Sequence, residues 1–195
     1  MKLIIASNNA HKIGEIKKIL SGKFDEILSL REAGIDHETV EDGNTFMENA
    51  RKKAREISEI SGFAALADDS GICAHALDGA PGIYSARFAG EHGNDSANNE
   101  LLLEKLADKD DRTAHYTAAI ALVFPDGKEV LSEGYMYGSI INEYRGTGGF
   151  GYDPLFVPDG EIRTVAEMTA EEKNAISHRA NALKGLLEKL SKIGL

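Results

Sequence analysis

Cysteine, tryptophan and long apolar runs are scarce or absent in this sequence. Cys73 is the only cysteine, and tryptophan does not occur. A lone cysteine cannot form an internal disulfide, which is typical of proteins in the reducing cytosol. The chain has no run of about 18 apolar residues, so we expect no membrane-spanning helix. The apolar stretch from Leu3 to Ala6 is too short for the core of a signal peptide, and we therefore expect a cytoplasmic protein.

Basic residues are also in the minority. The 195 residues include 22 Lys and Arg against 32 Asp and Glu, which gives a formal net charge of −10. This balance argues against nucleic acid or an anionic membrane as a partner. An acidic protein can still bind a polyanion through a local basic cluster or a metal ion. With 42% hydrophobic residues, the chain can form one globular domain over residues 1–195.

Hydrophobic periodicity predicts an α/β fold with a mixed sheet and flanking helices. Helices are expected at residues 10–20, 46–60, 95–106 and 165–168, and in a last segment that ends near Leu190. Strands are expected at residues 2–6, 27–30 and 63–67, and a hairpin at 114–124 and 128–141. Residues 71–93 are predicted to form a long loop. Because the hairpin dominates the second half, we expect two lobes around a central cleft.

The first loop combines a strand, a polar turn and a helix. Such a turn can bind an anion through unpaired N–H groups at the helix N-terminus, and Lys12 lies close enough to add a charge. The loop is not a Walker A motif, because its glycines are missing. The alternative is a simple helix cap made by Ser7 or Asn9.

Acidic residues follow the strand predicted at 63–67. Asp68 and Asp69 are expected in a turn, where two adjacent carboxylates repel each other unless a cation or a proton offsets the charge. Mg²⁺ prefers one or two carboxylates together with phosphate oxygens, so it is the predicted cation. Glu41 precedes the helix that carries Lys53. The alternatives are capping carboxylates and a solvated lysine.

Two later segments are candidate ligand sites. Residues 146–154 contain four glycines with Phe150 and Tyr152, and an aromatic ring in such a loop can stack on a nucleobase. Residues 171–179 contain Lys173, His178 and Arg179. In one continuous helix these side chains could not face one ligand, so a shared ligand requires a helix break near Ser177. The alternatives are a hairpin exit loop and an amphipathic terminal helix.

Taken in order, six segments resemble the inosine/xanthosine triphosphate pyrophosphatase family. They are residues 7–12, 41–54, 67–71, 79–87, 146–154 and 172–179. The resemblance implies an α/β fold of two lobes around a long central sheet, a homodimer and dependence on Mg²⁺. The implied reaction is the hydrolysis of ITP, dITP or XTP to the monophosphate and pyrophosphate. Many relatives carry Thr-Gly-Asn at Ser7-Asn8-Asn9, and Asn8 tolerates left-handed backbone better than most residues.

The resemblance also implies residue roles. Glu41 and Asp69 would serve the metal, and Asp69 would also accept a proton. The repulsion between adjacent carboxylates, rather than the resemblance, adds Asp68 to the predicted metal ligands. Arg179 and His178 could donate to the 6-oxygen of the base. Substrate-binding residues are predicted to be Ser7, Asn8, Asn9, Ala10, His11, Lys12, Lys53, Ser70, Phe150, Gly151, Tyr152, Asp153, Lys173, His178 and Arg179. A pyrophosphatase for other nucleoside triphosphates and a non-catalytic nucleotide sensor are the alternative functions.

Overall fold

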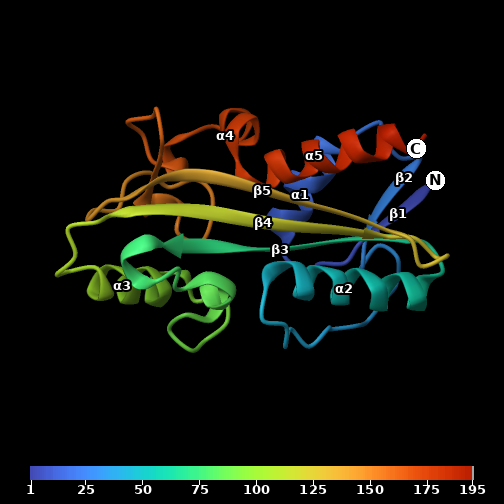
Figure 1. The fold of residues 1–195 in the computed structure, drawn as a ribbon, viewed down its shortest axis with the longest axis horizontal. Coiled ribbons are helices and arrows are strands. Elements are labelled where there is room, and N and C mark those ends of the chain that lie inside the picture. The colour runs from blue at the N-terminus through green and yellow to red at the C-terminus, as the bar shows by residue number, and fades with distance from the viewer. Residues whose placement is uncertain (195) are drawn as a thin grey trace. The chain divides into compact units, whose positions relative to one another are not determined.

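The computed structural model describes residues 1–194 and contains one six-stranded mixed sheet (Figure 1). The strand order is β2-β1-β3-β4-β5-β6. Strand β1 pairs in parallel with β2 and β3, whereas β5 and β6 are antiparallel. The strands are β1 Lys2–Ile5, β2 Glu26–Ser29, β3 Ala64–Ala74, β4 Thr113–Val123, β5 Glu129–Ile140 and β6 Phe156–Pro158. The helices are α1 Ala10–Ile19, α2 Phe46–Ser61, α3 Asp95–Lys105, α4 Ala170–Ile176 and α5 His178–Lys192.

The chain divides into two compact units, and β3, β4 and β5 contribute residues to both. Unit 1 comprises Met1–Asp69, Ala118–Gly134 and Arg179–Leu195. Within it, α2 covers one face of the sheet, and α1 and α5 cover the other (Figure 1). Each face has its own apolar cluster, and successive residues of a strand belong alternately to one cluster and the other. The near-continuous apolar runs of β1 and β4 follow from this burial on both faces.

Unit 2 comprises Ser70–Thr117 and Tyr135–His178. It has one apolar cluster, to which α3 contributes Leu102, β4 contributes Tyr116 and β6 contributes Phe156. Short 3₁₀ helices span His75–Leu77, Gly82–Arg87, Asp153–Leu155 and Val165–Glu167. No helix within residues 1–194 is long and apolar enough to cross a membrane.

The predicted α/β class, the hairpin, the helices at residues 10–20, 46–60 and 95–106 and the last helix are confirmed, and the helix predicted at 165–168 is a short 3₁₀ helix. Two local predictions are wrong. The acidic pair does not lie in a turn, because β3 continues through Asp68 and Asp69 to Ala74. Residues 71–93 are not one long loop, since they contain the end of β3 and two 3₁₀ helices. Glycine and acidic residues are typical turn residues, but pairing within the sheet outweighs this local preference.

Candidate functional site

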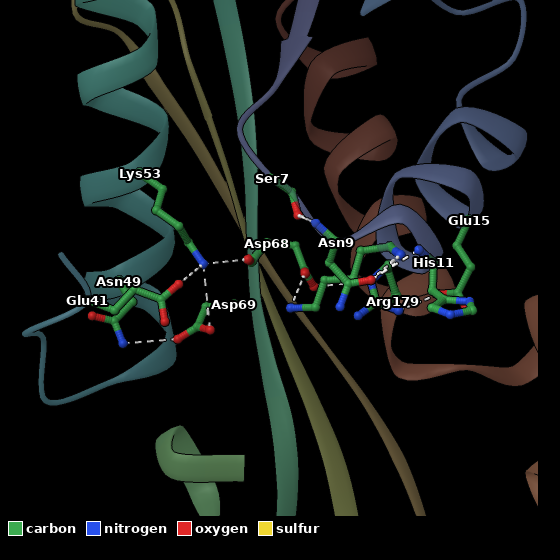
Figure 2. Close-up of polar contacts among 11 residues, drawn as sticks. Ser7, Asn9, His11, Glu15, Glu41, Asn49, Lys53, Asp68, Asp69 and Arg179 are labelled. Atoms are coloured by element: carbon green, nitrogen blue, oxygen red, sulfur yellow. Dashed lines mark hydrogen bonds and ion pairs between the residues drawn. The ribbon is translucent and has the colours of Figure 1, made fainter. Parts of the chain in front are cut away.

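Asp68 and Asp69 point to opposite faces of the sheet. Successive residues of a strand alternate between its two faces. Leu66 belongs to the cluster beneath α1 and α5, and Ala67 to the cluster beneath α2. Continuing this alternation, Asp68 faces α1 and α5, and Asp69 faces α2. Figure 2 shows the two carboxylates on either side of the β3 ribbon, so they do not share one cation as the sequence predicted.

The Asp68 carboxylate is buried between two basic side chains. Its Oδ1 lies 2.7 Å from Nζ of Lys12, and its Oδ2 accepts from Nε of Arg179 at 3.1 Å. Nη1 of Arg179 also donates to Glu15. Burial raises the pKa of Asp68, but the charges of Arg179 and Lys12 outweigh burial and hold that pKa below its usual range. Asp68 is therefore an ionised partner of two cations.

The Asp69 carboxylate has a different environment. Its Oδ2 accepts from the Asn49 side chain at 3.0 Å, and its Oδ1 lies 3.7 Å from Nζ of Lys53. Lys53 also donates to Glu41 at 2.5 Å and to the backbone carbonyl of Asp68 at 2.9 Å. Burial, together with the nearby charge of Glu41, raises the pKa of Asp69 above its usual value. A raised pKa makes this carboxylate a better proton acceptor than an ordinary aspartate.

Nζ of Lys53 lies close to three oxygen atoms. They belong to the carboxylates of Glu41 and Asp69 and to the backbone carbonyl of Asp68. Burial lowers the pKa of the Lys53 ammonium, but the charges of Asp69 and Glu41 outweigh burial and raise it. The lysine is therefore charged, and its position comes from α2, whose N-terminus is capped by Thr45. The solvated alternative applied equally to Lys52, the residue before Lys53, which pairs with the exposed Asp42 at 2.7 Å.

The donor set beside Asp69 suits a magnesium ion. Glu41 and Asp69 supply two hard carboxylate oxygens, and their mutual repulsion is relieved by a cation. Across residues 1–194, no group of three or more His, Cys, Asp or Glu side chains is arranged to hold a metal ion. Two carboxylates fit Mg²⁺ because this ion usually keeps waters and takes further oxygens from substrate phosphates.

The loop before α1 forms a helix cap. Oδ1 of Asn9 accepts from the backbone N–H groups of His11 and Lys12 at 3.0 and 3.2 Å, and Oγ of Ser7 accepts from the Asn9 N–H at 3.1 Å. The capping interpretation is thus confirmed, and two of the N–H groups considered for anion binding are occupied. Asn8, Asn9, Ala10 and His11 are exposed. The left-handed geometry considered for Asn8 is not adopted, since Asp78 is the one non-glycine residue of 1–194 with positive φ.

In unit 2, Asp153 organises the glycine-rich loop. Its Oδ2 accepts from Nζ of Lys173 at 2.8 Å and from the Phe150 N–H at 3.0 Å, and its Oδ1 accepts from the Tyr116 hydroxyl at 3.2 Å. The Lys173 ammonium lies 4.7 Å from the centre of the Phe150 ring. Gly149 has φ of +71°, and a Cβ there would collide with the Asp153 carboxylate. This collision explains one glycine of the motif.

The helix break predicted near Ser177 is confirmed. A capping box of Thr169 and Glu172 starts α4, and Ser177 has extended backbone (ψ 152°) before α5 begins at His178. Because the helix breaks here, the adjacent residues His178 and Arg179 contact different groups of side chains. The His178 ring stacks on Tyr116 with centroids 4.7 Å apart in unit 2, whereas Arg179 binds Asp68 in unit 1. The substrate role of Arg179 stays a prediction, with Nε and Nη1 bound by carboxylates in this structure.

The remaining predicted residues of unit 2 have structural partners. The Tyr152 hydroxyl donates to the Ser85 carbonyl at 2.7 Å, and the Gly151 N–H donates to Asp95 at 2.7 Å. Ser70, next to Asp69, continues β3.

Three residues that sequence reasoning did not assign complete these groups: Asn49, Glu15 and Tyr116. Asn49 lay within a family segment but carried no charge, and the other two have no local sequence signal.

Comparison with known proteins identifies the family. The model of the Ham1 family matches residues 3–189. The chain belongs to the Ham1 family. A curated relative from Clostridium perfringens, named dITP/XTP pyrophosphatase, is 52% identical over 98% of both chains.

Solved Ham1 proteins share the fold. The Staphylococcus aureus Ham1 protein is 39% identical with a TM-score of 0.88, over 98% of this chain and 99% of that one. A HAM1 protein from Coxiella burnetii is 38% identical with a TM-score of 0.89, over the same shares of the chains. The resemblance noted from the six segments is thereby confirmed, and Ham1 membership covers nearly the whole chain.

Proposed function

We propose that this protein hydrolyses the triphosphates of non-standard purines, namely ITP, dITP and XTP, to the nucleoside monophosphate and pyrophosphate. The observation that carries the proposal is the group around Asp69, in which Glu41, Lys53 and Asn49 surround a buried carboxylate of raised pKa. The dITP/XTP pyrophosphatase name of a relative that is 52% identical supports the substrate class.

The proposed reaction is attack of water on the α-phosphorus. The water oxygen forms the new P–O bond while the bond from the α-phosphorus to the pyrophosphate oxygen breaks. Asp69 accepts the proton of the attacking water, which its raised pKa favours. Asn49 holds Oδ2 of Asp69 and thereby sets the direction of the carboxylate.

Charge on the triphosphate is met by basic side chains. Lys53 and Lys12 bind phosphate oxygens, and an ammonium placed in advance stabilises charge that develops on the leaving pyrophosphate. Glu41 and Asp69 would hold Mg²⁺, which would supply further neutralisation of phosphate charge. Phe150, Lys173 and His178 are proposed to contact the nucleoside, as are the other unit 2 residues predicted from the sequence.

We propose further that residues 1–195 act as one catalytic domain, and that the protein is a cytoplasmic homodimer. The match of the Ham1 family model to residues 3–189 supports a single functional domain. The lone Cys73 is consistent with a reducing compartment. Light scattering on the purified protein will give the number of chains per particle.

Pyrophosphate release tests the proposed function directly. Rates should be measured with ITP, XTP, dTTP, UTP and ATP, each with Mg²⁺ and with a chelator. We expect release from ITP and XTP with Mg²⁺, much slower release from ATP, and none with the chelator. Faster hydrolysis of dTTP or UTP would favour a pyrophosphatase for other nucleotides. Binding of ITP without any release would favour a nucleotide sensor.

A further inference from the structure

A chain of four polar side chains in unit 2 lies outside the residues assigned to the proposed reaction. Oδ1 of Asp111 accepts from the Thr113 hydroxyl at 2.6 Å and from the Thr113 N–H at 2.9 Å. Oγ1 of Thr113 lies 2.8 Å from Nδ1 of His75, and Nε2 of His75 lies 2.9 Å from Nδ1 of His115. These hydrogen bonds join His75, the first residue of a 3₁₀ helix, to strand β4.

The hydrogen bonds determine which nitrogen of His75 carries its proton. Thr113 bonds to Asp111 lower the pKa of that carboxyl, so Asp111 is an ionised acceptor at neutral pH. The single hydroxyl proton of Thr113 is directed to Asp111, and Oγ1 must therefore accept from Nδ1–H of His75. In the tautomer with its proton on Nδ1, His75 presents the lone pair of Nε2 to His115.

The His115 ring is flanked by aromatic neighbours. It lies among exposed aromatic side chains of β5, with ring centres 6.0 Å from Tyr135 and 5.4 Å from Tyr137. Burial and the neighbouring His75 lower the pKa of His115. A neutral imidazole has one unprotonated nitrogen, which is the form that binds metal ions.

We propose that His75 and His115 form a binding site for a divalent transition-metal ion of the zinc class, with Nε2 of His75 and Nδ1 of His115 as its ligands. The ion takes the place of the proton that lies between the two rings. That proton moves to Nε2 of His115, so the neutral ring changes tautomer and loses no charge. The link from His75 through Thr113 to Asp111 is the outer support that metal-binding histidines commonly have.

The distances need only a small adjustment. Two Zn–N bonds of about 2.0–2.1 Å at a tetrahedral angle place the nitrogens roughly 3.4 Å apart. The present separation is 2.9 Å, and both histidines are at least partly exposed. Residues 1–194 offer no third His, Cys, Asp or Glu to this pair, so water completes the coordination. We therefore infer an exchangeable ion rather than a permanent structural one.

Calorimetric titration of the full chain with Zn²⁺ tests the site, with excess Mg²⁺ present to occupy the oxygen ligands near Asp69. We expect one Zn²⁺ per chain with the native protein. His75→Ala and His115→Ala should each weaken Zn²⁺ binding at least tenfold, and Thr113→Val should weaken it about tenfold through loss of the outer support. His92→Ala removes an exposed histidine of the same unit and should leave binding unchanged.

Nitrogen NMR of the histidine rings gives a second readout. In the metal-free protein, His75 should carry its proton on Nδ1, and Zn²⁺ should shift Nε2 of His75 together with Nδ1 of His115. Unchanged Zn²⁺ binding in both alanine variants would overturn the proposal. So would equal weakening in His92→Ala, or Zn²⁺ shifts confined to other histidines. None of these outcomes depends on pyrophosphate release, so failure here leaves the proposed function to its own test.

Discussion

Asp68 and Asp69 are neighbours in the chain but lie in different chemical environments. On the α1 and α5 face, Asp68 meets two permanent cations, and its pKa is lowered. On the α2 face, Asp69 meets one lysine, one amide and the carboxylate of Glu41, and its pKa is raised. Both are almost fully buried, with 1% and 7% of their surface exposed.

This difference shows that burial alone does not decide what a carboxylate can do. A buried carboxylate whose charge is already balanced stabilises its partners and has little attraction left for another cation. A buried carboxylate whose charge is incompletely balanced can take up a proton or a metal ion. We therefore assign structural support to Asp68 and chemistry to Asp69.

The largest expected effect is on the stability of Asp68→Asn. This change removes the carboxylate that accepts from Nε of the fully buried Arg179, which keeps its bond to Glu15 (Figure 2). Breaking a buried ion pair on one side costs about 3–5 kcal/mol, which urea unfolding will measure. Asp69→Asn is the matched control. It should lose far less stability, because replacing this carboxylate by an amide removes its repulsion with Glu41. Equal losses in the two variants would remove the distinction.

Asp69→Asn should have the larger effect on catalysis. We expect the kcat for pyrophosphate release from ITP to fall at least about 100-fold, because loss of a general base or a metal ligand usually costs that much. The circular dichroism spectrum should remain that of the native protein. A variant that keeps more than about a tenth of the native kcat would contradict both roles.

Asn49→Ala should have an intermediate effect. Asn49 donates to Oδ2 of Asp69, and loss of such an orienting contact at a metal site costs roughly tenfold or more. We expect kcat to fall by that factor while the preference for ITP over ATP is kept. Lys52→Ala, three residues further along α2, removes a surface contact with Asp42 and should leave kcat unchanged. A similar fall in both variants would indicate general disturbance of α2.

The smallest expected effect concerns Glu32, an exposed carboxylate that also pairs with a lysine. Hydrogen bonds from Lys17 and Ser29 lower the pKa of Glu32 from 4.5 to about 2. A lowered pKa in the folded state stabilises the protein above pH 4.5, and this contribution is lost as pH falls toward 2. Glu32→Gln should therefore be slightly less stable at neutral pH, with the difference shrinking on acidification. A loss as large as that of Asp68→Asn would show that burial is not what sets Asp68 apart.

Much of the fold was predictable because local patterns agree with the tertiary structure. Apolar runs marked the strands 2–6 and 114–124, and helical spacing with capping residues marked 46–60. The error at Asp68 and Asp69 arose because glycine and acidic residues normally end strands, whereas here pairing with neighbouring strands extends β3. Asn49 and Tyr116 were missed because uncharged residues gain a role only from what lies beside them.

The order of motifs along the chain was enough to indicate the family, the α/β class and the residue types available for phosphate and metal chemistry. The order and spacing of motifs can be recognised from the sequence without coordinates. The different environments of Asp68 and Asp69 could be recognised only from the tertiary structure. They depend on the two-residue period of β3, which turns one carboxylate toward Arg179 and the other toward Lys53. No sequence pattern states whether a pair of acidic residues occupies a turn or a strand, because pairing partners far along the chain decide it.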